Sequence, residues 1–284
     1  MKLTKKKTKE FVNLVKDYKN SDIQKLSQYL TDCPELINLK IDKMAKGIDG
    51  FSPLMLAIRY LNFEFAKLLI NKGANVNYID ESPVRDHHFP VFFDLIEIMR
   101  LIVESNNTSV ERIEELFSES LSVWQEMEKN DLDYNLTTPE TDIRKPENCL
   151  NAAIRLIGAS GKYGNKHHLH EESTYTPTDG NKTILRISHE SKNQLKEKMY
   201  KSILQKIIDK VDFDIIKSVD CSKHRFSSLF LNSFYEENGF IDSYALETSN
   251  ELIRNKFNFD LNNYRGKEAL KSLDENIERF ANTM

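Results

Sequence analysis

Apolar side chains near residue 54 recur at the spacing of a short helix. Leu54, Ala57 and Ile58 fall on one face, because residues three and four positions apart are neighbours on a helix. The polar Asn62 interrupts this pattern, and a second apolar face follows. That second face consists of Phe65, Leu68 and Leu69. The pattern predicts two helices joined by a tight turn, with the small Ala57 allowing close packing between them.

Capping residues mark the ends of this helix pair. Ser52 can accept a hydrogen bond at the N-cap, and Pro53 stands at the first helical position, where its missing N–H costs nothing. Gly73 follows the second helix and suits a left-handed C-cap. We therefore expect the pair to begin at residue 52 and to end at residue 73.

This stretch resembles an ankyrin repeat. The resemblance rests on the start Gly50-Phe51-Ser52-Pro53-Leu54, on Ala57 within the first helix and on the close Gly73-Ala74-Asn75-Val76-Asn77. It implies an all-α solenoid, because a single repeat buries its apolar face only against neighbouring repeats. It also implies a non-catalytic protein that binds a partner protein through a concave groove.

Weaker copies of the pattern predict about five helix-pair units in one domain. Asp131-Leu132-Asp133 mirrors Asn75-Val76-Asn77 as the close of such a unit. The expected units are an N-terminal cap at 1–45, the best-matched repeat at 46–78, degenerate repeats at 79–133, 134–214 and 215–262, and a capping helix at 263–284. Within them we expect helices at 8–18, 22–29, 113–128 and 191–209, and helix starts near residues 89, 148 and 227.

Three insertions interrupt the predicted units. Residues 79–88 and 134–147 lengthen the connections between units, where ankyrin proteins carry hairpin fingers. Residues 158–183 are rich in glycine, lack apolar periodicity and separate the two helices of the third unit, so we expect an exposed loop there.

Composition places the chain among soluble globular proteins. It has 284 residues, of which 39% are hydrophobic and 30% charged, and its net charge of −4 does not favour coating a polyanion. Cys33, Cys149 and Cys221 lie far apart and lack the spacing of a zinc site, which suits a reducing compartment. Without an apolar run of about 18 residues, we expect a cytoplasmic protein that contacts neither membrane nor nucleic acid.

Few residues suggest catalysis or cofactor binding. The run Gly158-Ala159-Ser160-Gly161-Lys162 lacks the spacing of a phosphate loop and is followed by Tyr163 instead of Ser or Thr. Three histidines and two glutamates could ligate a metal, which leaves a metal-dependent hydrolase as an alternative. These residues are His167, His168, His170, Glu171 and Glu172. We otherwise predict no cofactor, no metal and no enzymatic activity.

Asp94 is unusual because it replaces the small alanine expected on the buried side of a predicted inner helix. A buried carboxylate requires a partner, for which Arg100 and Arg85 are the candidates, or else it serves a function.

The resemblance to ankyrin repeats assigns residues to the concave groove. They are Ile48, Asp49, Phe51, Arg59, Tyr60, Arg85, Asp86, His88, Ile96, Glu97, Arg144, Lys145, Glu147, Arg155, Lys223, His224, Phe226, Phe234, Tyr235, Tyr264 and Arg265. Aromatic and arginine side chains dominate interface hot spots. Lysine and arginine outnumber acids in this set, so we expect a mildly positive groove and a partner with an acidic contact surface. An inhibitor of one specific enzyme, of the bacterial immunity or effector type, is the main alternative to a general interaction module.

Overall fold

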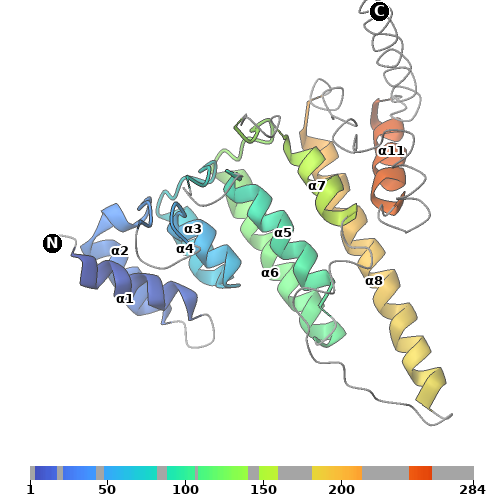
Figure 1. Cartoon of the computed structure of the whole chain (residues 1–284), viewed down its shortest axis with the longest axis horizontal. Coiled ribbons are helices and arrows are strands. Elements are labelled where there is room, and N and C mark those ends of the chain that lie inside the picture. The colour runs from blue at the N-terminus through green and yellow to red at the C-terminus, as the bar shows by residue number, and fades with distance from the viewer. Residues whose placement is uncertain are drawn as a thin grey trace, which may run out of the picture.

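The computed structural model describes eight stretches of the chain, which are mostly helical (Figure 1). The described residues are 4–17, 22–42, 48–81, 88–105, 108–139, 147–158, 181–212 and 243–257, without the side chains of 151, 155–158, 181–193, 243–247 and 249–250. The helices are α1 (Lys5–Lys16), α2 (Ile23–Asp32), the 3₁₀ turn η2 (Pro34–Leu36), α3 (Pro53–Arg59), α4 (Phe63–Asn71), α5 (Val91–Val103), α6 (Val110–Lys129), α7 (Cys149–Gly158), α8 (Asn181–Lys210) and α11 (Ser243–Phe257).

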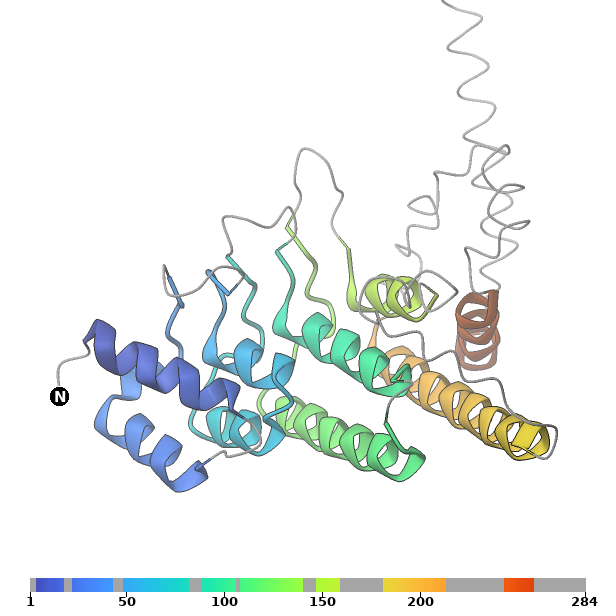
Figure 2. The same cartoon turned by 60° about the horizontal axis from the view of Figure 1, so that its bottom comes forward.

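Consecutive helices pair, and the pairs stack in two layers. Helix α3 packs against α1 and α5, and α5 packs against α7, so that α1, α3, α5 and α7 form an inner layer. Helix α4 packs against α2 and α6 in an outer layer, while α8 contacts α5, α7 and α11. Figure 2 shows the two layers, with the described hairpin arms rising on the side of the inner layer. The all-α fold expected from the sequence is confirmed.

The best-matched repeat forms as its sequence predicts. Ser52 Oγ accepts a hydrogen bond from the Met55 N–H at 3.2 Å, and Pro53 is the first helical residue of α3. Asn62 is buried, and its side-chain amide donates to the carbonyl of Val15 at 3.1 Å. The residue that interrupts the apolar pattern therefore ties the turn between α3 and α4 to α1.

Asparagine side chains join the closing turn of one unit to that of the next. Asn38 donates to the Gly73 carbonyl at 3.0 Å and accepts from the Asn75 N–H at 2.7 Å. Asn77 repeats both bonds one unit later, to the Asp131 carbonyl and from the Asp133 N–H, each at 2.9 Å. These bonds fix the spacing between neighbouring units.

The same bonds correct the predicted register of the third closing turn. Gly73 and Asp131 both have positive φ, at 92° and 61°. Asp133 accepts from the N–H two residues ahead, as Asn75 does. Asp131 therefore corresponds to Gly73 and not to Asn75, and the alignment predicted from Asp131-Leu132-Asp133 was wrong by two residues.

Two of the predicted insertions begin and end as hairpin arms. Isolated bridges pair Ile79 with Pro90 and Thr137 with Asn148. Helix α8 begins at Asn181, about ten residues before the predicted start, so the predicted loop at 158–183 is partly helical at its end. Most of that loop, the unit start near residue 227 and the capping helix at 263–284 lie outside the described residues.

A buried aromatic cluster connects the middle units. Trp124 is fully buried and contacts the Phe92 ring edge-on at 4.9 Å. Its Nε1 donates to the Tyr134 hydroxyl at 2.6 Å, which in turn donates to Glu128 at 2.6 Å. Lys206 of α8 donates to the other oxygen of Glu128 at 2.6 Å and lies over the Trp124 ring. This cluster fastens α8 to α6.

Candidate functional site

The inner surface is the face made by α1, α3, α5 and α7 and by the hairpins beside them. Part of the predicted binding set is described there, namely Ile48, Asp49, Phe51, Arg59, Tyr60, His88, Ile96, Glu97 and Glu147. Arg155 lies on α7, and its side chain is not described. The predicted residues Arg85, Asp86, Arg144, Lys145, Lys223, His224, Phe226, Phe234, Tyr235, Tyr264 and Arg265 lie outside the described residues.

Four of the predicted contact residues are buried. Phe51 is 1% exposed and Ile48 is 6% exposed, because both pack into the core where the hairpin enters α3. Ile96 and Glu147 are also buried. The sequence analysis placed all four in the concave groove, whereas the structure buries their side chains.

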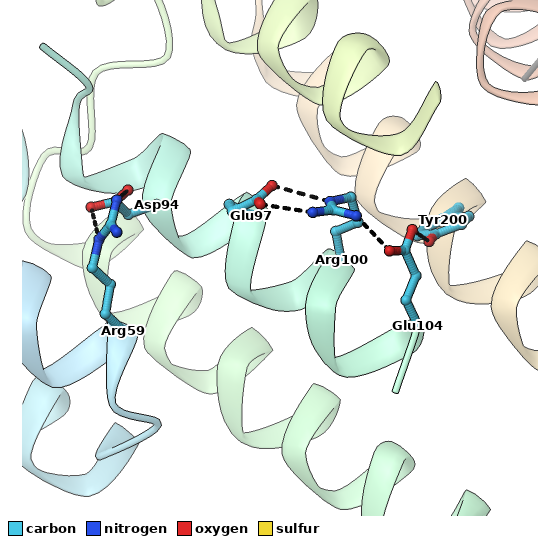
Figure 3. Close-up of polar contacts among 6 residues, drawn as sticks. All are labelled: Arg59, Asp94, Glu97, Arg100, Glu104 and Tyr200. Carbon is cyan, nitrogen blue, oxygen red and sulfur yellow. Dashed lines mark hydrogen bonds and ion pairs between the residues drawn. The ribbon is translucent and has the colours of Figure 1, made fainter. Parts of the chain in front are cut away.

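Arg59 is the last residue of α3 and connects this helix to α5 on the inner layer. Its Nε donates to Asp94 Oδ2 at 2.9 Å, and its Nη2 donates to Oδ1 of the same carboxylate (Figure 3). The guanidinium also lies over the Phe51 ring, 4.8 Å from its centroid. Burial by itself would lower the pKa of Arg59, but the bonds and charge of Asp94 outweigh it and raise that pKa.

The buried Asp94 is therefore paired with Arg59, from the preceding unit. The sequence offered Arg100 or Arg85, and the structure shows that Arg100 bonds other residues. Counted from the N-cap residues Ser52 and Pro90, Ala57 corresponds to Leu95. The sequence had suggested that Asp94 occupies the position of the small alanine. The structure shows that Leu95 occupies it instead.

Arg100 forms a second charged cluster on α5. Its Nε and Nη2 donate to Glu97 at 3.1 and 2.7 Å, and its Nη1 bonds Glu104. Tyr200 of α8 donates to the other oxygen of Glu104 at 2.7 Å, as Figure 3 shows. This cluster was not predicted from the sequence, although three- and four-residue spacing on one helix favours such bonds.

The two charged clusters around Arg59 and Arg100 together carry a slight excess of negative charge. Arg59 and Arg100 stand against Asp94, Glu97 and Glu104, which gives a net charge of −1 for this group. Of the seven cations behind the predicted positive groove, only Arg59 has a described side chain.

Two large apolar side chains are exposed next to these charges. Tyr60 is 36% exposed, and Lys16 lies over its ring at 5.3 Å. Leu101 of α5 is 44% exposed and was not predicted. An exposed leucine is common on protein surfaces. Its position on the inner layer is what makes Leu101 a contact candidate.

A shallow pocket of about 520 Å³ lies at the base of the hairpins. Its walls include Lys40, Tyr78, Glu81 and His88, and the Lys40 ammonium bonds Glu81. His88 Nδ1 lies 2.7 Å from the Asp80 carbonyl, which can only accept a hydrogen bond, so Nδ1 carries the proton.

Asp49, another residue of the predicted binding set, is half-buried. Its Oδ1 has no hydrogen-bond partner among the described residues.

Catalytic groups are sparse in the described part of the chain. No three His, Cys, Asp or Glu side chains of the described residues gather as a metal site, and residues 167–172 lie outside them. Burial raises the pKa of the Cys149 thiol to about 12, which keeps it protonated and a poor nucleophile. None of the described helices combines the length and apolar character needed to span a membrane.

Comparison with known proteins identifies one segment. Residues 49–81 match the family model of the ankyrin repeat. They cover the end of one hairpin, α3, α4, the closing turn and the first arm of the next hairpin. No curated protein and no solved structure matches the chain.

Proposed function

We propose that this chain, which contains an ankyrin repeat at residues 49–81, binds a partner protein along its inner surface without catalysis. Ankyrin repeats are protein interaction modules, and the stacking of α1, α3, α5 and α7 in one layer is the observation that supports this role. The stack brings side chains that are distant in sequence, such as Arg59 and Glu97, onto one continuous face.

The mechanism is occupancy by a preformed surface. Arg59 and Arg100 are already fixed by carboxylates, so little side-chain entropy is lost when a partner binds. The asparagine bonds between closing turns hold successive units at a constant spacing. A partner bound in this way is tethered, or its own active surface is blocked.

The proposed partner has an acidic patch that faces the hairpins. Arg85, Arg144 and Lys145 belong to the insertions that the sequence assigns to hairpin fingers. Opposite charge at such positions accelerates encounter more than it tightens the final complex. Association should therefore slow as salt rises, while dissociation changes little.

Site-specific photocrosslinking tests the proposed surface. A photoreactive phenylalanine analogue is placed at Tyr60 or Leu101, which are exposed on the inner layer. The matched control is Glu115, a 58% exposed residue of the outer helix α6. We expect one discrete protein to crosslink in the native cell from both inner positions and not from Glu115. Crosslinking from Glu115 alone, or from none of the three positions, would contradict the proposal.

A further inference from the structure

We infer that Arg59 is the recognition point of the inner surface and that it selects an uncharged hydrogen-bond acceptor of the partner, such as an amide oxygen, over a carboxylate. This inference rests on the proposed function, because it specifies what the partner presents at that surface. The partner segment that we expect Arg59 to bind carries this acceptor next to an apolar side chain.

The Arg59 side chain is preorganised. Asp94 fixes two of its nitrogens, with Nε to Oδ2 at 2.9 Å and Nη2 to Oδ1, while Phe51 supports the guanidinium. Asp94 is 3% exposed and Phe51 is 1% exposed, so both supports belong to the core. A side chain fixed in this way presents its remaining donors at low entropic cost.

The remaining donors of Arg59 have no hydrogen-bond acceptor among the described residues. A guanidinium carries five N–H groups, of which Asp94 uses one on Nε and one on Nη2. Among the described residues, Asp94 is the hydrogen-bond partner of Arg59, and 28% of the Arg59 side chain is exposed. Its Nη1 edge therefore offers donors at the inner surface.

The charge around Arg59 disfavours an acidic ligand. Asp94 already balances the positive charge of Arg59, and the buried Asp80 also acts on the guanidinium electrostatically, whereas the nearby Glu97 is itself paired with Arg100. A carboxylate brought to Nη1 would meet the negative charges of Asp94 and Asp80 and would lose its own hydration. A neutral carbonyl gains the same hydrogen bond without the repulsion.

The surroundings also specify an apolar neighbour. Tyr60 follows Arg59 directly and is 36% exposed, with Lys16 over its ring. An aromatic side chain of this kind contributes contact area at low entropic cost. The preferred segment therefore pairs an Asn, Gln or backbone carbonyl with an adjacent aliphatic or aromatic residue.

Random peptides serve as the probe, because they offer the inner surface many different acceptor groups at once. A phage-displayed library of random dodecapeptides is selected on the whole wild-type chain. Peptides that bind the wild-type chain but bind neither the Arg59→Gln nor the Tyr60→Ala variant are kept as surface-dependent. Glu115→Gln is the matched control, and it should bind the kept peptides as the wild type does. We expect the kept peptides to share Asn or Gln, and to be poor in Asp and Glu, next to an apolar residue.

The decisive measurement uses the wild-type chain and varies the peptide. Replacing the shared Asn by Asp, or the shared Gln by Glu, should weaken binding about tenfold, by isothermal titration calorimetry at low salt. In Asp94→Asn, which frees the charge of Arg59, the acidic peptide should bind at least as well as the neutral one. Thermal unfolding of Asp94→Asn checks that this variant is folded, and the wild-type comparison stands without it.

The outcomes separate this inference from the proposed function. If surface-dependent peptides are anchored by Asp or Glu in the wild-type chain, the selection of a neutral acceptor is wrong while the binding surface stands. If every selected peptide binds Arg59→Gln and Tyr60→Ala as well as the wild type, both the inference and the proposed surface are contradicted.

Discussion

The guanidinium of Arg59 lies over the ring of Phe51, with 4.8 Å between its Cζ and the ring centroid. Phe51 is buried at the point where the hairpin enters α3, whereas Arg59 reaches the surface at the other end of the same helix. A core ring thus supports a surface charge. We therefore expect Phe51 to affect a partner through the position of Arg59.

Truncating Phe51 should therefore reduce stability before it affects binding. Phe51→Ala removes a fully buried ring and should lower the free energy of unfolding by about 3–5 kcal/mol. Urea denaturation measures this loss. Tyr60→Ala is the matched control, because its ring is partly exposed and its loss should cost under about 1 kcal/mol. Equal costs for the two variants would show that Phe51 is not a core residue.

The Arg59–Asp94 pair predicts an asymmetry between its two members. Arg59→Met keeps the aliphatic stem but leaves a carboxylate that is 3% exposed without its cation. Asp94→Asn leaves an arginine that is 28% exposed and can recover water. Arg59→Met should thus cost about 2–3 kcal/mol of unfolding free energy and Asp94→Asn clearly less. A larger cost for Asp94→Asn would contradict the burial of the carboxylate.

The double variant completes a thermodynamic cycle for this pair. When both charges are removed, Arg59→Met/Asp94→Asn should be more stable than the sum of the single costs implies, by about 1–3 kcal/mol. Strict additivity in chemical denaturation would mean that the two side chains do not interact.

Glu128 links stability to pH. Its burial opposes ionisation, but the hydrogen bonds from Lys206 and Tyr134, together with the charges of Lys206 and Lys210, outweigh this and lower its pKa below 4.5. The folded pKa is depressed, so the contribution of Glu128 is fully present above pH 4.5 and is lost as the pH falls through the folded value.

Glu128→Gln should reduce this acid dependence. We expect a loss of about 1–2 kcal/mol at neutral pH, where the carboxylate accepts charged bonds, and a smaller difference from wild type below about pH 4. Thermal unfolding across this pH range measures both effects. Glu126→Gln is the control, because Glu126 pairs with an exposed lysine, Lys129, and should change stability by under about 0.5 kcal/mol.

Local sequence signals predicted the best-matched repeat well. Ser52, Pro53 and Gly73 each act through backbone geometry at their own position, so their roles are readable without knowing the rest of the fold. The amphipathic outer helix α6 was predicted within three residues at either end for the same reason.

The described site was harder to predict because it depends on register between units. Arg59 and Asp94 are 35 residues apart, and their pairing requires α5 to begin at Val91 with Pro90 as its N-cap. The sequence instead suggested a helix start near residue 89, which placed Asp94 at the alanine position. The burial of Phe51 was missed because a resemblance assigns a position to a face without showing how deeply this chain packs it.

Two closing turns provide a matched test of backbone conformation. Gly73 has a φ of 92°, and a Cβ added there would meet no atom within 4 Å, so the cost of Gly73→Ala is conformational and not steric. Asp131 has a φ of 61° in the corresponding turn, where a side chain is disfavoured. Gly73→Ala should destabilise the chain by about 1 kcal/mol, and Asp131→Gly should stabilise it by about 0.5 kcal/mol because the entropy lost by glycine offsets part of the gain.

The opposite signs of these two substitutions make the test sharp. Both can be measured as shifts in the urea midpoint at unchanged slope, since neither alters a buried side chain. The Asn77 bond to residue 131 uses a backbone carbonyl, so Asp131→Gly keeps it. Destabilisation by both substitutions would mean that the Asp131 side chain contributes a favourable contact, and the equivalence of the two turns would then be limited to their backbones.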